Sequence, residues 1–288
     1  MILWRMPHEI QERDLIMNNQ EDLQRIKALR LIDDEFMSVC FDNYIEGAEL
    51  LLKVILDRED LKVSEVRTQK AIKNLQGRDV WLDIYAADKA GIKYNIEIQR
   101  ADSGAHQKRA RYHSSMVDAD MLKPGESFNE LRENYVIFIT ENDVLGLEMP
   151  VYHIERIITE VKVDFNDGEH IIYVNGSIKT KDTALGRLMN DFYCTEADDM
   201  CYEELSSRVK KYKESAEGVE SMGSVFDEIR EEARNEGRKE GRNEGRNENA
   251  CEVALKMISS GKLTLEEISE YSGLPIEKVR ELAREKTA

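Results

Sequence analysis

Two short runs rich in β-branched and aromatic residues flank a turn signal, and this pattern constrains the fold more than any other part of the sequence. The runs are residues 80–85 and 94–98, and Asp88-Lys-Ala-Gly91 lies between them. Runs of this composition, separated by a short segment that contains glycine, predict an antiparallel β-hairpin. The chain is therefore expected to contain a sheet in the first half of its sequence.

Each predicted strand of this hairpin carries a carboxylate among apolar neighbours. Asp83 lies on the first strand, and Glu97 lies on the second with Gln99 two residues further on. Because side chains alternate between the faces of a strand, Glu97 and Gln99 share one face, and the turn at Gly91 would bring Asp83 beside Glu97. Two adjacent carboxylates repel each other unless a cation lies between them, and Mg²⁺ accepts such oxygen ligands. The pattern favours a metal site, although an amphipathic hairpin with both carboxylates facing solvent would have the same spacing.

The segments around the hairpin show helical and strand patterns in turn. Apolar residues at three- and four-residue steps predict helix in residues 10–58, 104–122 and beyond 181. Short apolar runs predict strands in residues 135–139, 151–158 and 171–174. The order is therefore helix, hairpin, helix, strands and a helical tail.

Residues 236–248 repeat a four-residue unit that begins Glu-Gly-Arg, and this repeat marks a domain boundary. Each glycine costs a helix about 1 kcal/mol relative to alanine, so the segment is expected to be a weak helix or an extended linker. It is either a solvated charged tether or a glycine-faced contact through which two chains associate. We expect a domain in residues 1–215, a charged helical linker in 216–249 and a small helical module in 250–288.

The C-terminal module carries the punctuation of two short helices. Thr264 and Glu267 have the spacing of a capping box, Gly273 is placed as a helix stop, and Pro275 opens the next helix. The arrangement is typical of a helix-turn-helix. The mixed charges of its second helix favour a unit for packing or dimerisation over one that binds DNA.

The charge of the chain limits where a nucleic acid could bind. The net charge of −17 argues against a general polyanion binder, but residues 61–115 hold eleven basic and six acidic residues. Within this segment, the candidate DNA contacts are Lys108, Arg109, Arg111 and Tyr112 on the predicted helix, where basic side chains could hold phosphates. The alternative is a helix that shows a basic face to solvent.

Several other functional classes are disfavoured. The four cysteines lack zinc-ligand spacing with histidine, and we expect reduced thiols. No run approaches the roughly 18 apolar residues of a membrane-spanning helix. Phosphate loops of the GxxxxGK[ST] form and GxSxG nucleophile motifs are both missing from the sequence. We therefore expect a soluble cytoplasmic protein without a membrane partner.

The hairpin resembles the active-site hairpin of the PD-(D/E)XK nuclease superfamily, in particular its Rpn-like, transposase-associated branch. The motifs that carry the resemblance are Leu82-Asp83-Ile84 and Asn95-Ile96-Glu97-Ile98-Gln99-Arg100, of which the second fits the I-E-x-Q pattern of the branch. The similarity continues through residues 108–115, 135–141 and 188–194, and a glycine-repeat tail is typical of these proteins.

The resemblance implies an α/β fold, in which a restriction-endonuclease-like core with a mixed central sheet flanked by helices precedes a helical C-terminal tail. It also implies a Mg²⁺-dependent DNA endonuclease of the transposase or recombination type, with Mn²⁺ as a substitute. Asp83, Glu97 and the backbone carbonyl of Ile98 would bind the metal, and Asp34 is a further candidate ligand unless it only caps a helix.

Gln99 departs from the superfamily pattern, because it replaces the usual lysine. It would orient the attacking water by hydrogen bonding alone, without the positive charge of lysine. The alternative function is a catalytically weak or inactive DNA-binding or regulatory protein that retains the nuclease fold. The glutamine and the acidic bulk of the chain favour this alternative.

Overall fold

The computed structural model describes residues 20–74 and 77–287. The chain divides into two compact units, residues 1–223 and 224–288. Within the described residues, no helix combines the length and the apolar character needed to span a membrane.

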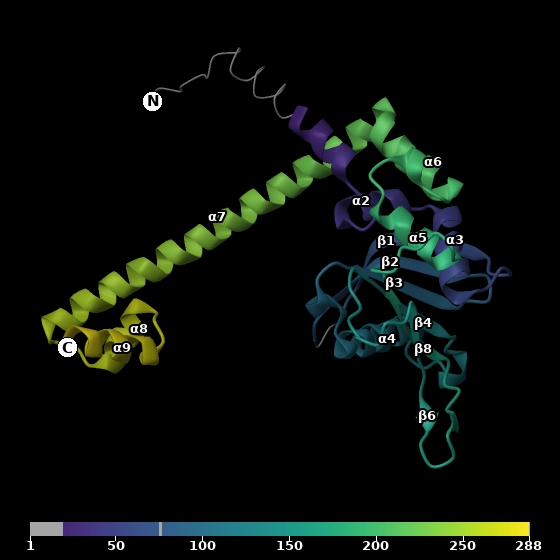
Figure 1. Cartoon of the computed structure of the whole chain (residues 1–288). Helices are drawn as coiled ribbons and strands as arrows, with labels where there is room; N and C mark the ends of the chain where they lie inside the picture. Colours follow the sequence, from purple (N-terminus) through teal and green to yellow (C-terminus); the bar gives the residue numbers. More distant parts are fainter. Residues whose placement is uncertain (1–19, 75–76, 288) are drawn as a thin grey trace. The chain divides into compact units, whose positions relative to one another are not determined.

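The first unit is built on a six-stranded sheet with the strand order β1-β2-β3-β4-β8-β5 (Figure 1). The strands are β1 (Val63–Ile72), β2 (Val80–Asp88), β3 (Lys93–Gln99), β4 (Asn134–Thr140), β8 (Glu169–Asn175) and β5 (Val151–Ile154). Strands β1, β2 and β3 are antiparallel, β4 runs parallel to β3 and β8, and β5 is antiparallel to β8. A separate short pair is formed by β6 (Ile157–Ile158) and β7 (Val163–Asp164). The predicted mixed sheet is confirmed.

Among its described residues, the first unit has five labelled helices, which lie on both sides of this sheet. They are α2 (Asp34–Phe41), α3 (Ile45–Leu56), α4 (Gln107–Met121), α5 (Ala184–Tyr193) and α6 (Glu203–Glu214), with short 3₁₀ turns η1 (Asp102–Ala105), η2 (Phe128–Glu130) and η3 (Ala197–Asp199). Figure 1 shows α4 on one side of the sheet and α2, α3 and α5 on the other. Helix α4 packs on β1, β4 and β8, whereas α2 and α3 pack on β1. The predicted α/β fold with flanking helices is confirmed.

The prediction of one helical pattern over residues 10–58 is wrong in its extent. Residues 20–28 are helical, and the chain then breaks before α2 and again before α3; residues 10–19 lie outside the described part. At the first break, Asp33 Oδ2 accepts a hydrogen bond from the Arg30 backbone N–H at 2.8 Å. At the second, Asn43 has a φ of 50°, which a continuous helix does not allow.

The turn of the β2–β3 hairpin is specified by two residues of the predicted signal. Asp88 Oδ1 accepts hydrogen bonds from the backbone N–H groups of Ala90 at 2.8 Å and Ile92 at 3.0 Å. Gly91 has a φ of 88°, which side chains with a Cβ rarely adopt. Aspartate and glycine therefore close the hairpin and set its register, and the predicted hairpin is confirmed.

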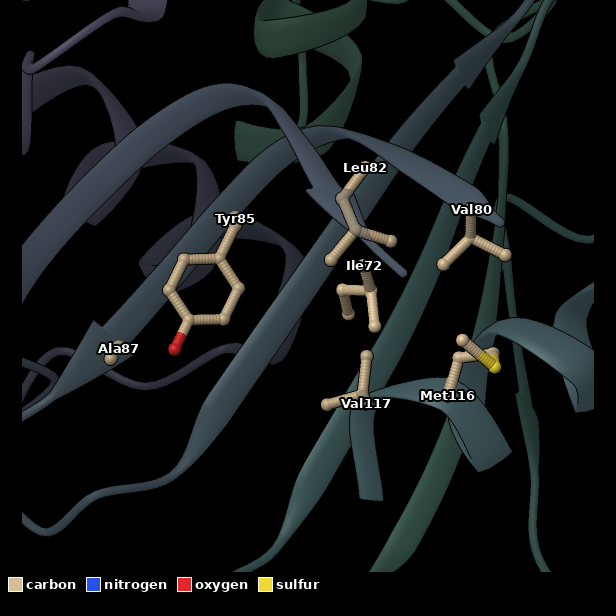
Figure 2. Close-up of a cluster of buried hydrophobic side chains, with 7 residues drawn as sticks. All are labelled: Ile72, Val80, Leu82, Tyr85, Ala87, Met116 and Val117. Carbon is tan, nitrogen blue, oxygen red and sulfur yellow. The ribbon is translucent and has the colours of Figure 1, made fainter. Parts of the chain in front are cut away.

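A buried apolar cluster holds α4 against the hairpin and β1. Its members are Ile72, Val80, Leu82, Tyr85, Ala87, Met116 and Val117, which Figure 2 shows meeting from the strands and from α4. On β2 the cluster contains Val80 and Leu82, which are two residues apart, and then Tyr85 and Ala87, which are again two apart. The face of β2 that points to the cluster therefore switches from even-numbered to odd-numbered residues after Leu82. Burying one large apolar side chain stabilises the fold by about 2 kcal/mol. The cluster therefore holds α4 on β1 and β2, next to β3, the strand that carries Glu97.

The second unit contains most of α7 (Ala216–Ser260) together with α8 (Leu265–Ser272) and α9 (Ile276–Thr287). Its core consists of Ala254, Ile268, Leu274, Val279 and Leu282. The predicted capping box is confirmed, because Thr264 and Glu267 exchange backbone-to-side-chain hydrogen bonds of 2.8 and 3.2 Å. The predicted stop at Gly273 is confirmed by its φ of 73°. The glycine repeat lies inside α7, which continues beyond residue 249.

Candidate active site

Glu97 lies in the middle of the sheet with its side chain completely buried. Its Oε2 accepts a hydrogen bond from Arg109 Nη2 at 3.0 Å, and its Oε1 lies 3.3 Å from His113 Nδ1. Despite this proximity, Oε1 accepts no hydrogen bond of acceptable geometry from the described residues. The alternative of a solvent-facing carboxylate is therefore wrong for Glu97. A buried carboxylate with an unsatisfied oxygen is costly, so its retention needs a functional explanation.

Asp83 lies beside Glu97, as the hairpin predicts. The β2–β3 pairing reaches Ile84 and Ile96, and one further residue on each strand leads to the two carboxylates. Asp83 Oδ2 accepts a hydrogen bond from the Ile98 backbone N–H at 2.9 Å. Burial, followed by the negative charge of Glu97, raises the pKa of Asp83 to about 8. The two carboxylates thus repel each other in a poorly solvated site.

Asp34, the first residue of α2, adds a third negative charge at longer range. Its Oδ1 accepts a hydrogen bond from Gln69 Nε2 at 3.1 Å. Although Asp34 keeps contact with solvent, partial burial raises the pKa of its carboxyl, and the charges of Glu35 and Glu97 raise it further. Across residues 20–74 and 77–287, no three His, Cys, Asp or Glu side chains lie close enough together to hold a metal ion. The candidate centre is therefore a pair of carboxylates.

The chemistry of this pair fits a divalent cation with a preference for oxygen ligands. The unsatisfied Oε1 of Glu97 offers a free lone pair. Burial and the negative charge of Glu97 raise the pKa of Asp83, and a bound cation would stabilise its charged form. Carboxylate oxygens are the ligands that Mg²⁺ and Mn²⁺ favour, usually together with water and substrate phosphate. The residues present therefore suit the metal that the resemblance implies.

Arg109, predicted to contact DNA, points its guanidinium into this site. Besides its bond to Glu97, Nη1 donates to Gln99 Oε1 at 3.3 Å and to the Gly104 carbonyl at 3.1 Å. Its Nε contacts His113 Nε2 at 3.3 Å. One side chain thereby fixes the carboxylate of Glu97 and the carboxamide of Gln99, and the contact of Arg109 with DNA stays a prediction.

His113 is a site residue that the sequence patterns did not identify. It is 4% exposed and lies one helical turn after Arg109. Because Arg109 Nε donates to Nε2, we assign the ring proton to Nδ1, which faces Glu97 Oε1 and the Asn95 amide at 3.3 Å each. An Asn95 orientation with Oδ1 toward the ring would satisfy that otherwise unpaired oxygen. The only sequence signal was the four-residue spacing of Arg109 and His113, which places both on one helix face.

An open groove of about 1430 Å³ runs along α4 and the start of β2. Its lining includes Arg78, Ser103, His106, Lys108, Arg109, Tyr112 and His113. Arg109 and His113 thus belong both to the groove and to the surroundings of Glu97. Lys108 and Arg111 are exposed, whereas the hydroxyl of Tyr112 is used internally, since it donates to the Arg78 carbonyl at 2.5 Å. The predicted basic helix therefore borders a groove that leads to the carboxylate pair.

The structure predicts a specific effect of replacing Gly104. A Cβ at this position would lie 2.0 Å from Gln99 Oε1, the far end of a flexible side chain. Gly104→Ala is expected to move the Gln99 carboxamide off Arg109 without unfolding the chain. It should lower the nuclease activity that the resemblance implies roughly tenfold, because small misplacements of reacting groups are costly. Rates of plasmid nicking test this effect. Gly223→Ala, where a Cβ meets open space, is the control; equal rates for both variants would contradict the placement of Gln99.

The mixed sheet, with two carboxylates on neighbouring strands beside a groove lined by basic side chains, fits the α/β nuclease fold that the resemblance implies. Residues 49–184 match the family model described as PD-(D/E)XK nuclease family transposase. The matched residues include Asp83, Glu97, Gln99 and Arg109, and the match confirms the predicted resemblance. No curated protein and no solved structure matches the chain.

Proposed function

We propose that this protein is a Mg²⁺-dependent DNA endonuclease that acts in the cytoplasm in transposition or recombination, with Mn²⁺ as an alternative ion. The observation that carries the proposal is the completely buried Glu97, which has an unsatisfied oxygen and lies beside Asp83. A carboxylate pair in which the pKa of one member, here Asp83, is raised is typical of functional sites and is an expensive way to stabilise a sheet. The family match supports a function of the nuclease or transposase type.

Asp83, Glu97 and the backbone carbonyl of Ile98 would hold the ion in this proposal. A bound Mg²⁺ supplies polarisation of the scissile phosphate and a lowered pKa for the attacking water. Gln99 would orient that water through a hydrogen bond, while its carboxamide is held by Arg109 Nη1. Asp34 would add negative charge to the site at longer range.

Substrate contacts would come from the groove beside the carboxylates. Lys108, which lines the groove, and Arg111, which is exposed on the same helix, would bind phosphates, and the ring of Tyr112 would line the path of the strand. Arg109 would act first as a positioning residue, since its guanidinium already bonds Glu97 and Gln99. Phosphate contacts of this kind make DNA binding weaken steeply with salt.

A supercoiled-plasmid assay with purified protein tests the dependence on metal. We expect nicked or linear product with Mg²⁺ or Mn²⁺ and intact plasmid with excess EDTA, and we expect activity to return when Mg²⁺ is added beyond the chelator. Cleavage that continues in EDTA would contradict the proposed chemistry.

The second candidate function is a DNA-binding or regulatory protein that keeps the fold with little or no catalysis. Gln99 in place of lysine and the net charge of −17 favour it. Gel shifts in Ca²⁺, which usually supports binding without cleavage, separate the two functions when combined with the plasmid assay. DNA binding with an intact plasmid under every metal would favour this second function, as would Mn²⁺ binding that does not require Asp83.

A further inference from the structure

The repeat in α7 arranges three kinds of side chain in adjacent columns on one helix. Successive residues of an α-helix are about 100° apart around its axis, so residues four apart lie nearly above one another. The column of Gly237, Gly241 and Gly245 therefore has glutamates on one flank and arginines on the other. The flanking columns are Glu236, Glu240 and Glu244, and Arg238, Arg242 and Arg246.

Within a single helix this arrangement is unfavourable. Neighbours at i,i+4 have the same charge in both columns, as for Arg238 with Arg242 and for Glu240 with Glu244. None of the three arginines has an acidic residue three or four positions away. All members of both columns are exposed, and none of them makes an ion pair in the described part of α7. The helix also carries three glycines, which weaken it further.

We propose that this face of α7 binds the same face of a second copy of the chain, as a parallel, in-register helix pair. A Cβ built on Gly237, Gly241 or Gly245 meets nothing within 4 Å, so the glycine column is open and lets another helix backbone come close. The glycines alone would not identify a partner. The charged columns identify the partner. Each column requires a column of opposite sign, and a second copy of this chain offers both a glutamate and an arginine column.

The charge pattern also selects the orientation of the pair. In a parallel pair related by a two-fold axis along the helices, the glutamate column of one helix meets the arginine column of the other. Arginines therefore face glutamates along both edges of the contact. In an antiparallel pair the same flanks meet, so arginines would face arginines and glutamates would face glutamates. Only the parallel arrangement offsets the repulsion between like charges within each column. This inference extends the predicted self-association through the tail and is independent of the proposed nuclease function.

Charge reversal in the full-length chain tests the contact. Wild type at 50 mM salt is expected to sediment with the mass of two chains and to dissociate at least tenfold more readily at 500 mM salt. Changing Arg238, Arg242 and Arg246 all to Glu, or Glu236, Glu240 and Glu244 all to Arg, should give single chains. An equimolar mixture of these two variants should again give the mass of two chains.

Each outcome of this test decides the proposal. A wild type that remains a single chain, a triple variant that remains paired, or a mixture that fails to pair would overturn it. Circular dichroism verifies that each variant keeps its helix content, and the recovery of pairing in the mixture excludes misfolding as the cause of dissociation.

Disulfide trapping tests the orientation, in a background with Cys194, Cys201 and Cys251 changed to Ala. Gly237→Cys is expected to form a disulfide with its own counterpart in the second copy, because the parallel register aligns identical residues. In an antiparallel pair centred on Gly241, position 237 would instead meet position 245. Cross-linking only in a mixture of Gly237→Cys with Gly245→Cys would therefore overturn the parallel arrangement.

Discussion

Asp83→Asn is expected to abolish cleavage and to stabilise the protein in EDTA at the same time. The variant removes one of the two carboxylates of the proposed metal site, and we expect the rate to fall roughly 10³-fold. It also removes a charge that is buried and that is repelled by Glu97, the two causes that raise the pKa of Asp83 to about 8. Asparagine retains an acceptor for the Ile98 backbone N–H, which bonds Asp83 at 2.9 Å.

The gain in stability should depend on pH with a defined sign. The folded state favours the protonated form of Asp83, because its pKa is raised there from 3.8 to about 8. The stabilisation from that protonated carboxyl is fully present below about pH 4 and is lost as the pH rises through about 8, where the buried carboxyl becomes charged. If half of that shift is expressed, Asp83→Asn stabilises the chain by about 3 kcal/mol at pH 8 and by almost nothing at pH 4. Urea unfolding at both pH values measures the effect, with Glu65→Gln on β1 as the matched control. An Asp83→Asn variant less stable than wild type at pH 8 would contradict the described electrostatics.

Arg109→Ala is expected to weaken both the fold and the reaction. It leaves the completely buried Glu97 without the guanidinium that bonds it at 3.0 Å. The Arg109 side chain is 38% exposed, and solvent therefore reduces the penalty for breaking a buried pair to about 2 kcal/mol. Cleavage should fall roughly 10²-fold because Gln99 loses its donor as well. Arg109→Lys keeps the charge but not the planar fork, so it should recover stability more than activity.

Lys108→Ala is the matched control for Arg109→Ala, because this neighbouring side chain is exposed on the same helix. We expect it to weaken DNA binding while the urea midpoint stays unchanged. An Arg109→Ala variant with wild-type stability and a defect in DNA affinity alone would contradict the positioning role and would favour the direct DNA contact predicted from the sequence.

Local patterns were sufficient to predict the hairpin and the position of its carboxylates. The turn chemistry of Asp88 and Gly91 and the alternation along β3 depend on residues close together in sequence, and the structure has both. The buried run in β4 was equally clear, because a strand covered on both faces is apolar along its length.

Features that depend on irregular backbone or on distant contacts were not predicted. Strand β1 shows no regular alternation, because its pairing shifts between Val63 and Glu65 and Gln69 has a φ of 50°. The burial of His113 depends on α4 crossing the sheet beside Glu97, which no local pattern reveals. For the same reason, the sequence identified Arg109 as a basic residue on a helix but not as the ion-pair partner of Glu97.

The most direct test of the central claim is plasmid cleavage by Asp83→Ala and Glu97→Ala beside wild type and Glu65→Ala. Glu65 is a carboxylate on the same sheet that pairs with Arg67 at 2.8 Å, so its variant controls for the loss of a negative charge. We predict Mg²⁺-dependent cleavage by wild type and Glu65→Ala, and none by either site variant when circular dichroism shows both to be folded. Cleavage at the wild-type rate by folded Asp83→Ala or Glu97→Ala would contradict the assignment of these two carboxylates as the nuclease centre.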